Sequence, residues 1–429
     1  MKLKVRNFAK ILKADIEVDG ITIIAGNNNT GKSTVGKILD AVFNATYHID
    51  ERMNRARIGS LASMLRREVE RNRDKINLRG RHYSSAVYQE FAKNLLACQK
   101  EDREKICKEY ERQMIPVSKQ ESDFVEKILG HLEDNEKISD KILSQAIYMS
   151  YFSESFHEEI NSLYSPDEPA EITVSIKGKE IRLTFKGNEC VQEDRQLDIF
   201  NSSLYIDDPF VLDEMNNNSS HGISELSIHK RNVLKKLLQK EDKSVEEKTF
   251  SNLLVENKLE DIMQIIDRVA AGEITKKQKY KYQFAEDYSK AIDVASLSTG
   301  LKAFLILKQI LLNGNLQDKD VIVLDEPEIH LHPEWQLLYA EVIVLLQKKF
   351  NFHIIVTTHS AHFMEALELY SKKYGISERC RYYLAGLQDN GAVFENVTEN
   401  ISKIYKQMVD PTLLLSRLRE ELEAEDDEL

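Results

Sequence analysis

Hydrophobic and polar positions along the first forty residues predict strands followed by a helix. The pattern indicates two short strands, then a buried strand over the apolar run ITIIAG, residues 21–26. A polar, glycine-containing loop follows, and helical periodicity begins near Lys32. The chain therefore opens with a strand, a loop and a helix in succession.

The middle of the chain changes to helical periodicity. From about Ala45 to Glu159 it is charge-rich and helical, and because no heptad repeat is sustained we expect helical hairpins. Residues 171–185 alternate around Gly178, which predicts a β-hairpin. An apolar stretch predicts a further strand near residues 204–208, the polar run 216–222 predicts a flexible loop, and residues 228–274 are helical and charged again.

From Val294 onward, apolar runs alternate with amphipathic helices. The runs DVIVLDEP, residues 320–327, and FHIIVTTHS, residues 352–360, predict neighbouring strands of a parallel sheet. The expected class is α/β, with a mostly parallel sheet, flanking helices and a large, mainly helical insertion. The expected segments are a first part of the α/β domain (1–45), the insertion (46–290), a second part of the domain (291–390) and a C-terminal segment with an acidic tail (391–429).

Composition and charge narrow the class of protein. The chain has 429 residues, a net charge of −12 and four cysteines without a CxxC pair, so reduced thiols are expected. No signal peptide or apolar span is apparent, which predicts a cytoplasmic protein without membrane contact. The charge argues against general nucleic-acid coating. The stretch 52–81 nevertheless holds ten Lys or Arg residues against three acids, which fits either a solvated helix face or a DNA or RNA contact.

The loop after the third strand has the spacing of a phosphate-binding loop. GNNNTGKST matches G-x-x-x-x-G-K-[ST] and lies between a strand and a helix, as that motif requires. We expect ATP phosphates to lie on backbone N–H groups, with Lys32 bridging the β- and γ-phosphates and Ser33 binding Mg²⁺. Asn29 is compatible with a positive φ. The expected nucleotide-contacting residues are Gly26, Asn27, Asn28, Asn29, Thr30, Gly31, Lys32, Ser33 and Thr34.

Two further strands end in groups that suit phosphoryl transfer. Asp325 and Glu326 follow an apolar strand, which predicts a Mg²⁺ ligand and a residue that polarises the attacking water. His359 ends another strand and is a candidate sensor of the γ-phosphate. Ser298 begins an amphipathic helix and could be a helix cap or an anion ligand.

The segment LDEPEIHLHP allows a second interpretation, a transition-metal site. Glu328, His330 and His332 could converge on one ion. A buried structural pair of acids at Asp325 and Glu326 is a further alternative.

These motifs, in this order, resemble the ABC-type ATPase heads of the SMC, RecF and OLD families. The resemblance rests on KLKVRNFAKI, the phosphate-binding loop, the signature-like LSTGLK, the Walker B segment VIVLDEPEIHLHP and the histidine of TTHSAH. It is greatest to OLD-like ATPases of bacterial anti-phage systems. The resemblance implies a homodimer or higher oligomer in which Ser298 and Gly300 act in trans and His359 acts in cis. It also implies that His330 and His332 lie in a loop at the dimer interface.

The sequence also departs from these families. LSTGL replaces LSGGQ, no Q-loop glutamine can be placed, and the chain after residue 386 is too short for the Toprim nuclease of OLD enzymes. The leading hypothesis is therefore an ATP-driven dimeric switch that controls a separate nuclease or toxin in anti-phage defence. The alternatives are a DNA-repair ATPase that binds DNA directly and a scaffold that binds ATP without hydrolysis.

Overall fold

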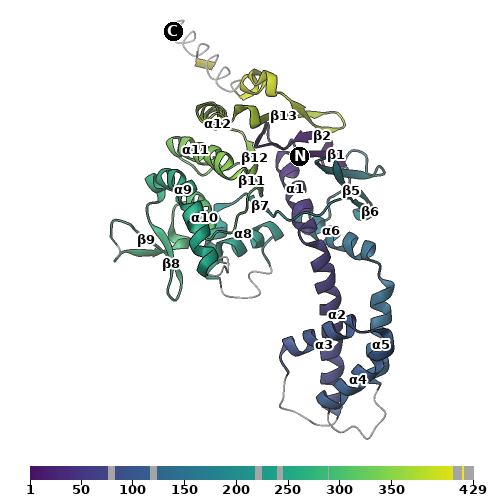
Figure 1. The fold of residues 1–429 in the computed structure, drawn as a ribbon. Helices are drawn as coiled ribbons and strands as arrows, with labels where there is room; N and C mark the ends of the chain where they lie inside the picture. Colours follow the sequence, from purple (N-terminus) through teal and green to yellow (C-terminus); the bar gives the residue numbers. More distant parts are fainter. Residues whose placement is uncertain are drawn as a thin grey trace. The chain divides into compact units, whose positions relative to one another are not determined.

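The computed structural model describes residues 1–75, 83–115, 123–217, 225–238, 245–287, 289–408 and 418–419. The chain divides into two compact units, one formed by Met1–Tyr47 with Tyr148–Leu429 and the other by His48–Ile147. We call the first the head and the second the helical unit (Figure 1). Within the described ranges, no helix is both long and apolar enough to cross a bilayer.

The head is built on one mixed sheet of eleven described strands. Their order is β6-β5-β4-β1-β2-β14-β13-β3-β12-β11-β7. The half from β13 to β7 is parallel and contains β3, β12 and β11, whereas β6 to β2 pair antiparallel. The strands are β1 (Lys2–Phe8), β2 (Ile11–Glu17), β3 (Ile21–Gly26), β4 (Ala170–Ile176), β5 (Lys179–Lys186), β6 (Glu189–Arg195), β7 (Ser203–Ile206), β11 (Val321–Asp325), β12 (His353–Thr358), β13 (Cys380–Gln388) and β14 (Gly391–Asn396).

Helices cover both faces of the parallel half. On one face α1 packs against Tyr205 and Val323, and a Cβ on Gly36 of α1 would lie only 2.6 Å from Val323. Because side chains alternate along a strand, Leu204 and Leu324 face the opposite side, in the core that contains residues of α10 and α11. The helices of the head are α1 (Lys32–Thr46), α8 (Ile228–Leu238), α9 (Val245–Ala270), α10 (Thr299–Leu312), α11 (Pro333–Phe350) and α12 (Ala361–Lys373), with the short helices η1 (Pro209–Asn216), η2 (Val294–Ser296), η3 (Ser377–Arg379) and η4 (Thr398–Asn400).

The helical unit has its own apolar core, in agreement with the predicted helical hairpins. Leu61 and Leu65 of one helix lie in this core with Leu132 of another, and the rings of Phe91 and Tyr110 stack at 3.5 Å. The helices are α2 (Ile49–Lys75), α3 (Ser85–Ala97), α4 (Lys100–Met114), α5 (Phe124–Lys137) and the first part of α6 (Asp140–Phe156).

The compact helical unit is smaller than the insertion predicted at residues 46–290. The predicted hairpin and the strand near 204–208 belong to the head, because β4 pairs with β1 and β7 pairs with β11. The region predicted as helical to residue 274 also ends in a small sheet of β8 (Glu273–Lys276), β9 (Tyr280–Gln283) and β10 (Ala291–Asp293). Hydrophobic alternation identifies strands, but it does not identify the strands with which they pair.

The C-terminal boundary also differs from the predicted one. The head was expected to end at residue 390, yet β14 pairs with β13 and β2. The acidic tail lies almost entirely outside the described residues, and so do residues 218–222 of the predicted flexible loop.

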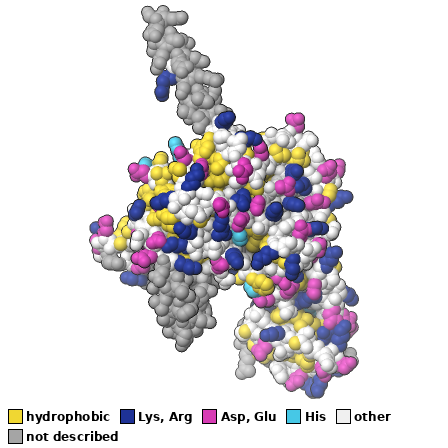
Figure 2. Space-filling view, turned by 45° about the horizontal axis from the view of Figure 1, so that its top comes forward, with side chains coloured by type: hydrophobic (Ala, Val, Ile, Leu, Met, Phe, Trp, Pro, Cys, Tyr) yellow, Lys and Arg dark blue, Asp and Glu magenta, His cyan; other side chains and the backbone are white. Residues whose placement is uncertain are grey.

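Arginines of the basic stretch meet acids on their own helix. In α2, Arg66 lies 2.9 Å from Glu70 and Arg71 lies 3.6 Å from Glu68. Acidic and basic side chains are also interspersed over the face shown in Figure 2. This arrangement favours the solvated helix face over a nucleic-acid surface for the described part of the stretch; residues 76–81 lie outside it.

Candidate functional site

The loop between β3 and α1 has the backbone of a phosphate cradle. Gly26, Asn29 and Gly31 have φ values of 151°, 66° and 78°. A Cβ at Gly26 would lie 2.4 Å from the carbonyl oxygen of Ala385, so glycine is required there. Asn29 has a positive φ, with which an asparagine is compatible, and its side-chain oxygen accepts a hydrogen bond from Lys10. These turns lead directly into the N-terminus of α1, where free N–H groups favour anions.

Lys32 is the buried cation of this loop. Its side chain is only 4% exposed, and its Nζ donates to the carbonyl oxygen of Asn27 at 3.0 Å. Burial lowers the pKa of Lys32 below its ordinary value of 10.5, and Glu326 and Asp325 oppose that shift in part. A desolvated ammonium group flanked by carboxylates is suited to take a phosphate oxygen as a further partner.

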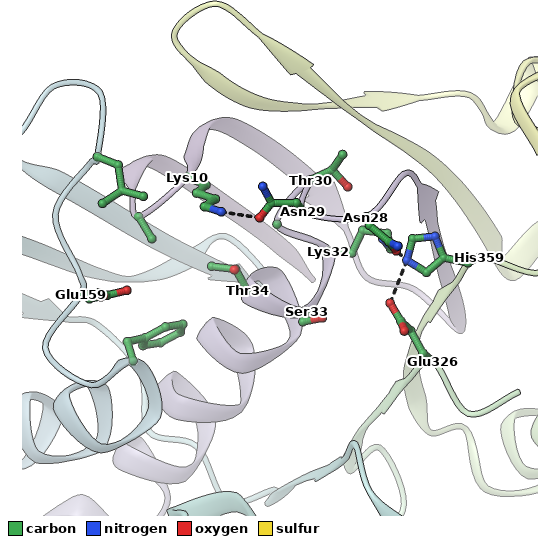
Figure 3. A pocket seen from close by; sticks show the side chains of 14 residues that line it. Lys10, Asn28, Asn29, Thr30, Lys32, Ser33, Thr34, Glu159, Glu326 and His359 are labelled. Carbon is green, nitrogen blue, oxygen red and sulfur yellow. Dashed lines mark hydrogen bonds and ion pairs between the residues drawn. The ribbon is translucent and has the colours of Figure 1, made fainter. Parts of the chain in front are cut away.

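His359 lies between Lys32 and Glu326. Its Nε2 is 2.7 Å from Lys32 Nζ and 2.9 Å from Glu326 Oε1 (Figure 3). Burial lowers the pKa of His359 below 6.5, and the charge of Lys32 lowers it further. A neutral ring can accept from Lys32 at Nε2, whereas donation to Glu326 requires a proton on the same atom. The two contacts are therefore alternatives, and the position of one proton selects between them.

Glu326 is aimed at the pocket by an unusual backbone conformation. Its φ is 51°, a left-handed value that costs energy for a residue other than glycine. Its N–H donates to Thr357, at 3.2 Å to the carbonyl oxygen and 3.0 Å to Oγ1, which holds the strained turn in place. The carboxylate consequently points toward His359, where an attacking water could be polarised.

Asp325 is held by two hydroxyl groups. Thr357 Oγ1 donates to its Oδ1, and the hydroxyl of Tyr205 donates to its Oδ2 at 2.5 Å. Burial and this carboxylate raise the pKa of Tyr205 well above 10, so the phenol remains a donor. Each carboxylate oxygen retains acceptor capacity, which suits a Mg²⁺ ligand. Sequence analysis missed Tyr205 because 120 positions separate it from Asp325.

Glu328 organises the backbone around His359. Its Oε1 accepts from the hydroxyl of Thr358 at 2.5 Å and from the N–H of His359 at 3.0 Å. The side chain is 4% exposed, and burial raises its pKa. Glu328 therefore joins the segments that carry Glu326 and His359.

A pocket of about 310 Å³ collects most of the predicted nucleotide site (Figure 3). The predicted residues that line it are Asn28, Asn29, Thr30, Gly31, Lys32, Ser33, Thr34, Glu326 and His359. Ala9 and Lys10, from the turn between β1 and β2, complete the wall with Phe156, Glu159 and Leu163. Ala9 and Lys10 belong to the segment KLKVRNFAKI that carried part of the resemblance, whereas Phe156, Glu159 and Leu163 had no motif signal in the sequence. A nucleoside triphosphate with its γ-phosphate at His359 would direct its base and ribose toward them.

Ser298 and Gly300 lie apart from this pocket. Neither is among its lining residues. Ser298 occupies the N-cap position of α10, yet its hydroxyl forms no capping hydrogen bond within the described chain. A Cβ at Gly300 would lie 3.0 Å from the His330 carbonyl oxygen and 3.0 Å from the ring of Trp335, so this glycine allows close packing of the loop after Walker B.

The transition-metal interpretation is wrong for the described residues. Glu328 is buried and directed at Thr358 and His359, whereas His330 and His332 are exposed. The described ranges contain no group of three or more His, Cys, Asp or Glu side chains placed to hold a metal ion. The donors that remain, a cradle of N–H groups with Lys32, Ser33 and Asp325, fit a nucleotide with its own Mg²⁺.

Comparison with known proteins agrees with this geometry. A family model described as an AAA ATPase domain matches residues 1–364. A protein from Escherichia coli described as "Retron Ec83 probable ATPase" is 30% identical over 125 residues, which cover 27% of this chain and 22% of that protein. The match thus spans about a fifth of the length of that relative.

SMC heads are among the similar solved structures. The SMC head domain from Thermotoga maritima has 12% sequence identity and a TM-score of 0.38, with 92% of this chain and 98% of that chain covered. An SMC head bound to the C-terminal winged-helix domain of ScpA has 12% identity and a TM-score of 0.42, with 94% and 98% covered. TM-scores this low do not identify a fold.

Proposed function

The chain belongs to the AAA ATPase domain family, and from this premise we propose that it hydrolyses ATP with Mg²⁺ as an ATP-driven dimeric switch. One observation supports hydrolysis above all others. Lys32, His359 and Glu326 meet within hydrogen-bond distance in the pocket that the phosphate-binding loop lines. A lysine beside the phosphates and a carboxylate that can position water are groups suited to phosphoryl transfer to water, which depends on positioning and charge stabilisation.

Each residue has a role that follows from its contacts. Lys32 gives up its bond to His359 and binds the phosphates, which leaves the imidazole to contact the γ-phosphate. Glu326, held by Thr357, orients and polarises the attacking water. Ser33 and Asp325 would hold Mg²⁺, which supplies charge neutralisation at the phosphates when bound. Catalysis then arises chiefly from positioning and preorganised charge.

The hydrolysis proposal is tested with Glu326→Gln. This variant keeps the size of the side chain but weakens the polarisation of the water, so phosphate release should fall by about 10²- to 10⁴-fold. Binding of a fluorescent ATP analogue should change little, because the Glu326 carboxylate pairs with His359 and forms no hydrogen bond to the phosphate-binding loop within the described residues. If Glu326→Gln releases phosphate as fast as the wild type, another residue must polarise the attacking water. A wild type that binds ATP with negligible turnover would support the scaffold alternative.

We extend the proposal to a composite site in a homodimer. The exposed hydroxyl of Ser298 begins α10 outside the pocket of its own chain, as expected for a group that contacts nucleotide on a second copy. Ser298→Glu would set a carboxylate against the γ-phosphate of that copy, and Lys32→Ala would disable the chain's own pocket. Each variant alone should be inactive. A random mixture should recover about a quarter of the wild-type rate, because half of the dimers are mixed and each holds one intact site. No recovery would confine the site to a single chain.

The switch is proposed to control a separate effector, a nuclease or toxin, in anti-phage defence. The resemblance to OLD-like ATPases motivates this assignment, and the retron ATPase among the relatives supports it. Tagged Glu326→Gln purified from its native host with ATP and Mg²⁺ should retain a second polypeptide that is lost without nucleotide. Identification of that polypeptide as a nuclease or toxin is the required result. Recovery of DNA alone would favour the DNA-repair alternative.

A further inference from the structure

The edge strand β7 brings a tyrosine hydroxyl to the Mg²⁺ ligand of the proposed site. β7 runs parallel to β11 with Tyr205 opposite Val323 and Ile206 opposite Leu324. The fully buried phenol extends along the sheet to Asp325, and its hydroxyl donates to Oδ2 at 2.5 Å. Thr357 donates to the other oxygen from the strand on the opposite side. The Asp325 carboxylate is therefore held from both neighbouring strands.

Packing fixes the ring of Tyr205 in this orientation. The ring of His229 lies 5.1 Å away in an edge contact, and Lys37 Nζ lies 6.0 Å from the ring centroid. On the side of α1, a Cβ at Gly36 would lie 3.2 Å from Tyr205 Cε2, so the helix backbone closes directly over the ring. A side chain enclosed in this way has little freedom to reorient, and its hydroxyl restricts the carboxylate in turn.

We propose that Tyr205 is a positioning residue that orients Asp325 to bind Mg²⁺ with the nucleotide. This inference rests on the proposed function, because it assigns the Mg²⁺ to Asp325. Hydrogen bonds from outer groups hold a ligating carboxylate in its binding orientation, and their loss typically weakens metal affinity by about 10- to 100-fold. Tyr205 is not among the residues that line the pocket, so its contribution should appear only when the metal is present.

The test compares nucleotide affinity with and without Mg²⁺ in the full chain. Calorimetric titration with a non-hydrolysable ATP analogue, in excess Mg²⁺ and in EDTA, gives the factor by which the metal tightens binding. Tyr205→Phe should reduce that factor about tenfold and leave the affinity in EDTA within about twofold of the wild type. Tyr383→Phe is the matched control, because Tyr383 is equally buried in the same sheet and its hydroxyl accepts from Glu17 N–H at 2.8 Å. The control should leave the factor unchanged.

A second variant separates the hydroxyl from the volume of the ring. Tyr205→Leu should show the same loss of the Mg²⁺ factor with a lower melting temperature. If Mg²⁺ tightens nucleotide binding to Tyr205→Phe by a factor within about twofold of that for the wild type, the proposed role of Tyr205 is overturned. Failure of both variants to fold would overturn it too, because the hydroxyl would then be a determinant of stability. A wild type that binds equally with and without Mg²⁺ would overturn the metal assignment as well. Mg²⁺-dependent binding without turnover would refute hydrolysis alone and leave the role of Tyr205 testable by the same titration.

Discussion

Asp40 of α1 should make the head less stable as the pH rises. The carboxyl is 3% exposed, and Asn44 Nδ2 donates to its Oδ1 at 2.8 Å. Burial raises the pKa of Asp40 from 3.8 to about 6, against the charge of His229 and the hydrogen bond from Asn44. The folded protein therefore holds this proton more tightly than the unfolded chain. The resulting stabilisation is fully present below pH 3.8 and is lost as the pH rises through about 6.

The magnitude follows from the size of the shift. A change from 3.8 to about 6 corresponds to about 3 kcal/mol between the limits of low and high pH, of which about 2 kcal/mol falls between about pH 4.5 and pH 7.5. Asp40→Asn keeps an acceptor for Asn44 and has no charge to desolvate. Relative to the wild type, this variant should gain about 2 kcal/mol of unfolding free energy over that pH interval.

Urea unfolding followed by the fluorescence of Trp335 measures this effect. Trp335 is the only tryptophan of the chain and lies in the same unit as Asp40. Asp207→Asn is the matched control from the adjoining strand end. Burial alone would raise the pKa of Asp207, but the hydrogen bond from His229 and the charge of Lys230 lower it, so its pH dependence should have the opposite sign. A difference between Asp40→Asn and the wild type that does not change with pH would refute the reasoning.

Two further predictions concern the groups around the proposed catalytic pocket. Glu328→Ala removes the acceptor of the buried Thr358 hydroxyl and of the His359 N–H, so it should lower the free energy of unfolding by about 2–4 kcal/mol in the same urea assay. Glu328→Gln retains an acceptor and should lower it by about 1 kcal/mol. Equal losses in both variants would contradict this account. Because burial and Lys32 hold the pKa of His359 below 6.5, the ring should be neutral at higher pH, and wild-type phosphate release should lose activity from its protonation only below that value. His359→Gln should abolish that acidic limb, and a limb that persists unchanged would belong to another group.

The sequence by itself determined the parts of the site that local backbone chemistry specifies. A phosphate cradle forms in almost any context from two glycines, a lysine and a helix start, here Gly26, Gly31 and Lys32. The reason is that N–H direction and positive φ are properties of a few consecutive residues. In the same way, apolar strands ending in Asp325 and His359 indicated groups at one edge of a parallel sheet.

Tertiary structure alone decided which remote strands complete that edge. Tyr205 reaches Asp325 only because β7 pairs with β11, and Phe156 and Leu163 reach the pocket only because the chain returns to the head within α6. Glu328, which could be interpreted as a metal ligand from its neighbours in sequence, instead accepts from Thr358 and His359 in a buried position. Pairing and burial depend on which surfaces exclude water together, and the free energy of that packing is distributed over residues far apart in the chain.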